Sequence, residues 1–315
     1  MWRVIGKGLY GTVHHLCADD SDNSCIVVKG ITKDCHHTAR EYRFQKAIYV
    51  AFQELRRSQI ESRLLRNVQR YIRISKPLFL CGSPLYLDEQ RFECGFGMTR
   101  LHGVALRTLD CVVTPDFVPS TVQAHLAFNT HEYGLKGADI TKKVSESNMV
   151  RGYYMSTADD CLSRMFPSDI TIDDLKNIMR FVLLYIVYSC DLYPKDVEFS
   201  VGYDPTVHEY VINVLDFGMV TNKGDNILDE LLQGLSEEPY VSFVNTSADR
   251  NNTVDIISLC EEITGKRHPH RFSKIPDVSS MSIKTLRHEL DQKKIPYGDV
   301  IEKSELVRRL LQYYS

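Results

Sequence analysis

Short hydrophobic runs alternate with longer helical repeats along this chain, and the alternation predicts a mixed α+β fold. Runs of a few β-branched and aromatic residues predict strands in the first third. They cover residues 2–5, 12–17, 25–30, 78–81 and 92–98. Between the third and the fourth run, apolar residues recur near helical spacing from about Thr38 to Phe52, which predicts a helix. Residues 1–100 therefore form a small β-rich part with one long helix.

The longest apolar run lies at residues 178–187 and predicts a buried helix over residues 173–189. Thr171 is suited to cap this helix, and Asp173 and Asp174 fall in its first turn, where negative charge is favourable. Further elements are predicted behind it: strands at 197–201 and 210–215 and helices at 225–235 and 255–263, with a polar, loop-rich stretch at 236–253. Residues 104–167 are interrupted by Pro and Gly and predict only short pieces.

The C-terminal end has a pattern of its own. Residues 265–280 are rich in Pro and basic residues and predict a linker. Residues 281–315 predict two short helices around a turn, with a small leucine core. That core comprises Leu286, Leu290, Ile295, Leu306 and Leu310.

Three aspartates that follow the buried helix in the sequence have a spacing typical of phosphoryl-transfer sites. Asp191 is followed five residues later by Asp196, and the hairpin then ends in Asp216-Phe217-Gly218. In such a site one carboxylate orients the acceptor hydroxyl and two further oxygen ligands hold magnesium over the phosphates. We therefore expect Asp191 to be the catalytic base or the orienting carboxylate, and Asp196 and Asp216 to be metal ligands.

The nucleotide-binding residues are expected upstream. Gly6, Gly8, Gly11 and Val13 match the pattern G-x-G-x-x-G-x-V, in which glycines let a hairpin backbone approach phosphates. The β-branched run 26–28 ends in Lys29, as expected for a strand whose lysine contacts the α- and β-phosphates. Glu41, in the following helix, is expected to form the ion pair that positions this lysine.

In this order, these motifs resemble those of the protein kinase superfamily, in a divergent form, over about residues 3–220. The resemblance implies a two-lobed fold with lobes at 1–100 and 101–264, and it implies ATP and Mg²⁺ as cofactors. The sequence departs from the family at Ser189-Cys190-Asp191, where His-Arg-Asp is usual, at Asp196, where Asn is usual, and behind Gly218, where Ala-Pro-Glu is missing. Residues 195–202 and 151–154 are also similar to a fungal kinase-like family of unknown function.

Three functions stay open on these observations. The first is an atypical kinase that binds ATP and Mg²⁺ and phosphorylates a protein or small-molecule hydroxyl. The second is a pseudokinase scaffold that docks a protein partner. The third is a nucleic-acid- or chromatin-associated adaptor, because residues 281–315 resemble a SAP-type helix–turn–helix and carry a mild excess of basic residues.

Composition restricts the class of protein and its cellular compartment. A net charge of −3 and a hydrophobic fraction of 43% are ordinary for a globular protein and give no drive toward nucleic acid or membrane. No apolar run of membrane-spanning or signal-peptide length occurs, so we expect an intracellular protein, cytoplasmic or nuclear. The nine cysteines form no C-x-x-C pair, which predicts reduced thiols, and Cys35-His36-His37 predicts a polar loop rather than a metal site.

Basic residues gather between Arg56 and Lys76, where six arginines and one lysine face a single acidic residue, Glu61. This segment is either a solvated helix face and connector, or a docking surface for an acidic or phosphorylated partner. Arg151 likewise has two interpretations, a structural ion pair or a phosphate contact.

Overall fold

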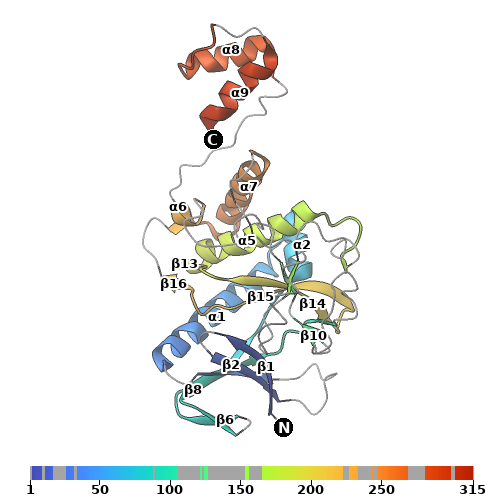
Figure 1. The fold of residues 1–315 in the computed structure, drawn as a ribbon, viewed down its shortest axis with the longest axis vertical. Coiled ribbons are helices and arrows are strands. Elements are labelled where there is room, and N and C mark those ends of the chain that lie inside the picture. Colours follow the sequence, from blue (N-terminus) through green and yellow to red (C-terminus); the bar gives the residue numbers. More distant parts are fainter. Residues whose placement is uncertain are drawn as a thin grey trace.

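The chain folds into a mixed α+β structure, as its hydrophobic pattern predicts (Figure 1). The computed structural model describes residues 2–8, 11–16, 26–31, 34–87, 89–105, 121–122, 124–126, 153–155, 165–222, 227–232, 241, 243, 247–268, 281–298 and 302–314. Leu9 and Tyr10 of the glycine motif, Arg151 and Gly152, and most of the linker at 265–280 lie outside these residues.

The N-terminal part is an antiparallel five-stranded sheet of order β1-β2-β3-β8-β5. Its strands are β1 (Trp2–Gly8), β2 (Gly11–Leu16), β3 (Ile26–Ile31), β5 (Pro77–Cys81) and β8 (Cys94–Thr99). All five predicted strands are confirmed, with small shifts at their ends. A short hairpin, β6 (Leu85–Leu87) and β7 (Gln90–Phe92), lies between β5 and β8, and its Leu87 and Phe92 pack on Val28 of β3.

Helix α1 (Cys35–Leu55) joins this sheet to the rest of the fold. The prediction of a polar loop at Cys35-His36-His37 was wrong, because the Asp34 side chain accepts a hydrogen bond from the His37 backbone (2.9 Å) and caps the helix before those residues. At the other end of α1, Ile48, Phe52 and Leu55 are buried in the main core. The Phe52 ring meets the Tyr185 ring edge-on, which ties α1 to the central helix.

A second, mixed sheet has the order β12-β11-β14-β15-β4. Its strands are β4 (Ile72–Ile74), β11 (Ala124–Leu126), β12 (Tyr153–Met155), β14 (Glu198–Asp204) and β15 (Glu209–Leu215). The predicted hairpin is β14–β15, in which Glu198 pairs with Leu215. β4 was not predicted; it follows α2 (Arg63–Tyr71) and runs parallel to β15. Two two-stranded pairs complete the strands: β9 (Val104–Ala105) with β10 (Thr121–Val122), and β13 (Leu192–Tyr193) with β16 (Thr221–Asn222).

Helix α5 (Ile172–Cys190) is the centre of the core, and its residues 178–188 are all buried. The predicted cap is confirmed as a capping box, in which Thr171 and Asp174 each accept from the other's backbone N–H. α6 (Ile227–Leu232) and α7 (Ser247–Thr264) pack beside it (Figure 1). α7 begins well before residue 255, so part of the predicted loop at 236–253 is helical.

The basic segment between Arg56 and Lys76 is held largely by ion pairs to other elements. Arg63 reaches Asp174 at 3.0 Å, Arg73 reaches Asp204 at 2.7 Å, and Arg70 pairs with Glu209. Such contacts fix the position of α2 and β4, so three of the seven cations in this segment have a structural role. Arg56 and Lys76 form no ion pair with a described carboxylate.

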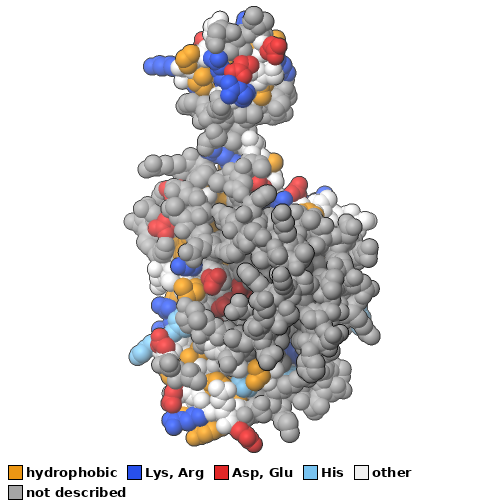
Figure 2. All heavy atoms as spheres, viewed as in Figure 1, with side chains coloured by type: hydrophobic (Ala, Val, Ile, Leu, Met, Phe, Trp, Pro, Cys, Tyr) orange, Lys and Arg blue, Asp and Glu red, His pale blue; other side chains and the backbone are white. Residues whose placement is uncertain are grey.

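The C-terminal unit consists of α8 (Ile283–Gln292) and α9 (Lys303–Tyr314). Leu286, Leu290, Leu306 and Leu310 are fully buried against one another, with Ile295 packed at the edge, so the predicted leucine core is confirmed. Basic and acidic side chains are interspersed on the face of this unit seen in Figure 2.

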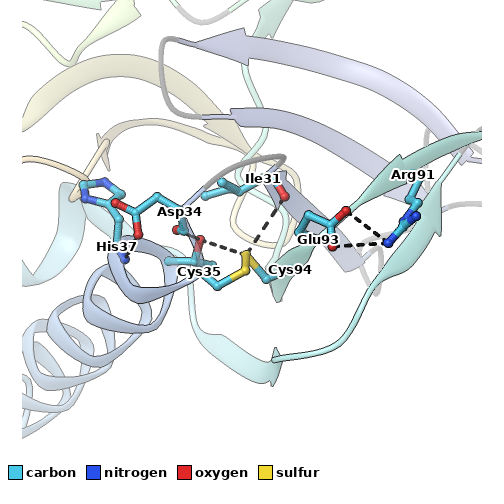
Figure 3. The surroundings of a disulfide bond; sticks show 8 residues. Ile31, Asp34, Cys35, His37, Arg91, Glu93 and Cys94 are labelled. Atoms are coloured by element: carbon cyan, nitrogen blue, oxygen red, sulfur yellow. Dashed lines mark hydrogen bonds and ion pairs between the residues drawn. A yellow bond between two sulfur atoms is a disulfide. The ribbon is translucent and has the colours of Figure 1, made fainter.

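One pair of cysteines departs from the expectation of reduced thiols. Cys35, in the first turn of α1, is disulfide-bonded to Cys94 at the start of β8 (Figure 3). Their Cα atoms lie 5.6 Å apart, within the usual range for a disulfide. The two residues are 59 positions apart in the sequence, and their proximity follows from how α1 crosses the sheet, which the spacing of cysteines does not reveal.

Candidate functional site

Three predicted site residues meet where β3, α1 and the end of β15 come together. The Nζ of Lys29 lies 2.6 Å from Oε1 of Glu41 and 3.9 Å from Oδ1 of Asp216. The Lys29 and Glu41 side chains are only 11% and 3% exposed, whereas that of Asp216 is 38% exposed. One cation thus faces a buried carboxylate on one side and a solvent-accessible carboxylate on the other.

Burial and charge act in opposite directions on this ion pair. Burial alone would lower the pKa of Lys29, but the carboxylates of Glu41 and Asp216 more than offset it and raise that pKa. Burial raises the pKa of Glu41, and Lys29 only partly counters it. We expect Lys29 to stay charged at neutral pH, because removing its proton would leave Glu41 with an uncompensated buried charge.

The glycine-rich hairpin lies directly beside Lys29. Gly8 pairs with Gly11 across the turn from β1 to β2, and Val13 of β2 pairs with Lys29 of β3. A Cβ atom at Gly11 would lie 2.8 Å from the Gly30 carbonyl oxygen and 3.5 Å from Cγ of Lys29. This position therefore requires glycine for close packing against β3. Gly6 lies in β1 opposite Val13, just past an irregularity in strand register.

Backbone geometry independently singles out the three predicted aspartates. Asp191, Asp196 and Asp216 have φ angles of 54°, 59° and 49°. These values lie in the left-handed region of backbone conformation, which residues other than glycine rarely adopt. They are three of the six non-glycine residues with positive φ in the described part of the chain. Such conformations persist where the surrounding structure imposes them, often at functional sites.

Asp216 is fixed by its own turn. Its Oδ1 accepts a hydrogen bond from the Gly218 backbone N–H at 3.1 Å. A Cβ atom at Gly218 would lie 3.1 Å from that same oxygen and 3.6 Å from Oε2 of Glu41. Glycine at 218 thus leaves room for the carboxylates of this cluster.

Asp191 terminates α5 and has different partners. Lys266 Nζ lies 2.7 Å from its Oδ2, and His268 Nε2 lies 3.6 Å from its Oδ1. Both residues follow the end of α7, where Gly265 turns the chain with a φ of 66°. The ring of His268 is also held edge-on against Tyr188, so this short segment is fixed beside Asp191.

Asp196 is exposed in the turn between β13 and β14. No group of three or more His, Cys, Asp or Glu side chains is placed to hold a metal ion among the residues that the structure describes. Mg²⁺ does not need such a cage, because it is commonly held by one or two carboxylates, waters and substrate phosphates. The exposed carboxylate of Asp196 and the partly exposed carboxylate of Asp216 fit that kind of binding.

Sequence motifs missed several residues around the site. Lys266 and His268 are about 75 residues from Asp191 along the chain, within a segment whose composition predicts a linker, so no local signal marks them. Glu198, whose charge raises the pKa of Lys29, stands two residues after Asp196 and faces Leu215 across the hairpin. The predicted hairpin already places Glu198 opposite Leu215, next to Asp216, so its position near the site could have been inferred from the sequence.

Comparison with known proteins gives little further guidance. No family model matches the chain. One curated protein, a trigger factor from Mycoplasmopsis synoviae (strain 53), is 31% identical over 83 residues, which is 25% of this chain and 18% of that protein. The chain thus spans less than a fifth of that relative's length. No helix in the described segments is long and apolar enough to cross a membrane.

Proposed function

We propose that the chain is a divergent, two-lobed kinase-like protein that binds ATP with Mg²⁺ between the five-stranded sheet and the β14–β15 hairpin. The observation that carries this proposal is the Lys29 cluster: Nζ within 4 Å of both Glu41 and Asp216, next to a glycine hairpin that packs against β3. These residues come from four motifs that span more than 200 residues of the sequence, from Gly6 to Asp216.

Each side chain has a role in this proposal. Lys29 donates to phosphate oxygens and is held in position by Glu41. Asp216, with Asp196, supplies the carboxylate oxygens for Mg²⁺. ATP supplies the phosphoryl group, and the metal ion offsets the charge of the phosphates. Asp191 accepts the proton of the acceptor hydroxyl. Lys266 places a positive charge beside the Asp191 carboxylate.

A thermal-shift titration of the full chain with Mg²⁺ and ATP tests binding. At a ligand concentration 100-fold above Kd, binding stabilises a protein by about 2.7 kcal/mol, or about 5 to 10 °C for a domain of this size. Lys29→Met and Asp216→Asn should reduce the shift. Lys46→Met, at an exposed position of α1, is the matched control and should leave it unchanged. An unshifted melting curve in the wild-type protein argues against the proposal.

A pseudokinase scaffold is the second candidate, and the surroundings of Asp191 favour it. Both carboxylate oxygens of Asp191 lie near a cationic or titratable partner, Lys266 at 2.7 Å and His268 at 3.6 Å, although the side chain remains 63% exposed. Turnover separates the two candidates: an active enzyme transfers or hydrolyses the γ-phosphate and loses this in Asp191→Ala, with ATP affinity kept. A scaffold shows ATP-induced stabilisation with no turnover in either protein.

A further inference from the structure

A small cavity lies at the opposite end of α1 from Glu41. It has a volume of about 240 Å³, is partly open to solvent, and is lined by the C-terminal half of α1, by α2 and β4, and by the end of β8. Glu41 and Arg56 are 15 residues apart, or about 22 Å along a helix, so the cavity is separate from the Lys29 cluster. The site proposed for ATP does not use it.

The charge of this cavity is one-sided. Arg56, Arg73 and Lys76 line it, and no acidic residue does. The guanidinium groups of Arg56 and Arg73 both donate to a single neutral acceptor, the Ile72 carbonyl oxygen, at 3.1 and 3.0 Å. Asp204 balances the charge of Arg73 at 2.7 Å. Arg56 and Lys76 form no ion pair with a described carboxylate, and Asp204 acts on Arg56 only at longer range.

The apolar side chains that line the cavity restrict the size and shape of the uncharged part of the ligand. Phe52 and Ile72 are buried and line it, and Tyr49 stands beside Arg56. A cavity smaller than the usual 300 Å³ or more for drug-sized ligands admits a compact molecule with one flat or branched apolar body. Guanidinium groups bind phosphate and carboxylate oxygens in paired hydrogen bonds.

The frame of the cavity is already ordered. The Lys76 backbone N–H donates to Oγ1 of Thr99 at 2.9 Å, and the Thr99 N–H donates to the Lys76 carbonyl at 3.0 Å. Gln69 ties α2 to the end of α1 through the Leu55 carbonyl at 3.0 Å. The backbone around the cavity would therefore lose little conformational entropy when a ligand binds, whereas the exposed Lys76 side chain would become ordered.

The geometry points to an anion-binding site for a phosphate monoester on an aromatic ring, held by Arg56 and Lys76 with Arg73 behind them. Either a free metabolite or a phosphorylated tyrosine side chain of a partner carries that chemistry. The inference does not depend on ATP binding, since no residue is shared with the Lys29 cluster.

Binding of phenyl phosphate to the full chain, followed by phosphorus NMR, tests this site. Arg56→Gln and Lys76→Gln should each weaken binding about tenfold, the usual effect of losing one hydrogen bond to a charged group. Arg57→Gln is the matched control, because Arg57 is the exposed neighbour of Arg56 and does not line the cavity. Lys76→Gln removes no hydrogen bond of the described fold, so it stays informative if Arg56→Gln unfolds.

Two comparisons identify the source of the ligand and the location of the site. A short peptide with one phosphotyrosine that binds more tightly than phenyl phosphate assigns the site to a protein partner, and weaker binding assigns it to a small molecule. Benzyl alcohol, which lacks the charge, should not compete. Displacement of phenyl phosphate by Mg²⁺ and ATP, an equal loss in Arg57→Gln, or no binding at millimolar concentration would overturn the proposal.

Discussion

Lys29 and Glu41 are charged side chains that the fold keeps almost completely out of water, so each depends on the other. Removing one partner of a buried pair costs about 3 to 5 kcal/mol, because the remaining charge is buried without compensation. We predict a loss of this size in the free energy of unfolding for Lys29→Met at pH 7, measured in urea. The double variant Lys29→Met/Glu41→Leu should recover most of it. An unchanged stability of the single variant would contradict the buried ion pair.

The same variant should have a pH dependence of known sign. Burial raises the pKa of Glu41, and without Lys29 that effect is no longer countered. The folded state then binds the Glu41 proton more tightly than the unfolded state does, so the stability of Lys29→Met should rise as the pH falls from 8 toward the unfolded pKa of 4.5. The wild-type protein, measured in parallel, should show a smaller rise, because Lys29 partly counters the effect of burial on the pKa of Glu41.

Lys266 acts on Asp191 at an exposed position and should matter for turnover more than for stability. The two side chains are 42% and 63% exposed, and ion pairs of this kind contribute about 0 to 1 kcal/mol. If the chain transfers phosphate, Lys266→Met should lower kcat about tenfold or more, with the ATP-induced thermal shift kept. Arg267→Gln, at the exposed neighbouring residue, should keep both. Equal turnover in Lys266→Met and the wild type would remove Lys266 from the mechanism.

At the scale of the residue, sequence motifs found the Lys29 cluster and missed the surroundings of Asp191. The glycines, the lysine and the Asp-Phe-Gly turn are recognisable because each has a local signature of strand, turn or helix. The contact from Lys266 has none, since it depends on where α7 ends and how Gly265 turns the chain. Ion pairs over such distances follow from packing, which a sequence does not display.

The β1–β2 hairpin provides the test at the scale of the element. A methyl group at Gly11 would press on the Gly30 carbonyl oxygen at 2.8 Å, and overpacking of this kind costs about 1 to 3 kcal/mol. We predict that Gly11→Ala lowers the free energy of unfolding by that amount and weakens ATP-induced stabilisation. Gly82→Ala is the control, with nothing within 4 Å of the new atom and an expected change of about 0.5 kcal/mol or less. Equal effects of the two substitutions would contradict the close packing at Gly11.

Secondary structure was predictable wherever hydrophobic period and capping residues agreed. The five strands of the first sheet, the β14–β15 hairpin and α5 with its Thr171 cap all follow that rule. The sequence did not predict β4, because three residues after a helix are too few to show a hydrophobic period. The strand forms by pairing with β15. The sequence predicted α7 too short because the first turns of this helix are polar. Thr253 in these turns is nevertheless buried, and its hydroxyl donates a hydrogen bond to the Phe243 carbonyl oxygen at 2.7 Å.

At the scale of the whole molecule, the C-terminal unit has its own small core. The four buried leucines of α8 and α9 pack on one another and on Met281, Ile295, Tyr297 and Val307, all from the same unit. A segment this short has marginal stability, since units below about 40 residues bury too little surface. Leu306→Ala removes about 2 to 5 kcal/mol, enough to unfold it.

We therefore predict that Leu306→Ala melts α8 and α9 and leaves the main unfolding transition of the full chain in place. Deletion of residues 279–315 should likewise leave the midpoint of that transition unchanged. Circular dichroism should show the lost helix, and calorimetry the unchanged main transition. A drop in the main transition in either variant would show that the unit stabilises the rest of the chain.

The deletion of residues 279–315 also tests nucleic-acid binding. The Glu305 carboxylate accepts from both Arg308 and Arg309, and these contacts lower the pKa of Glu305 to about 2. Two of the seven Lys and Arg residues of this unit are thus already paired at neutral pH, which reduces the positive charge available to phosphates. We predict weak retention on DNA or RNA at physiological salt, and the same retention after deletion of residues 279–315. Strong, salt-sensitive retention that the deletion abolishes would favour the adaptor function instead, because release of counterions makes phosphate contacts steeply dependent on salt.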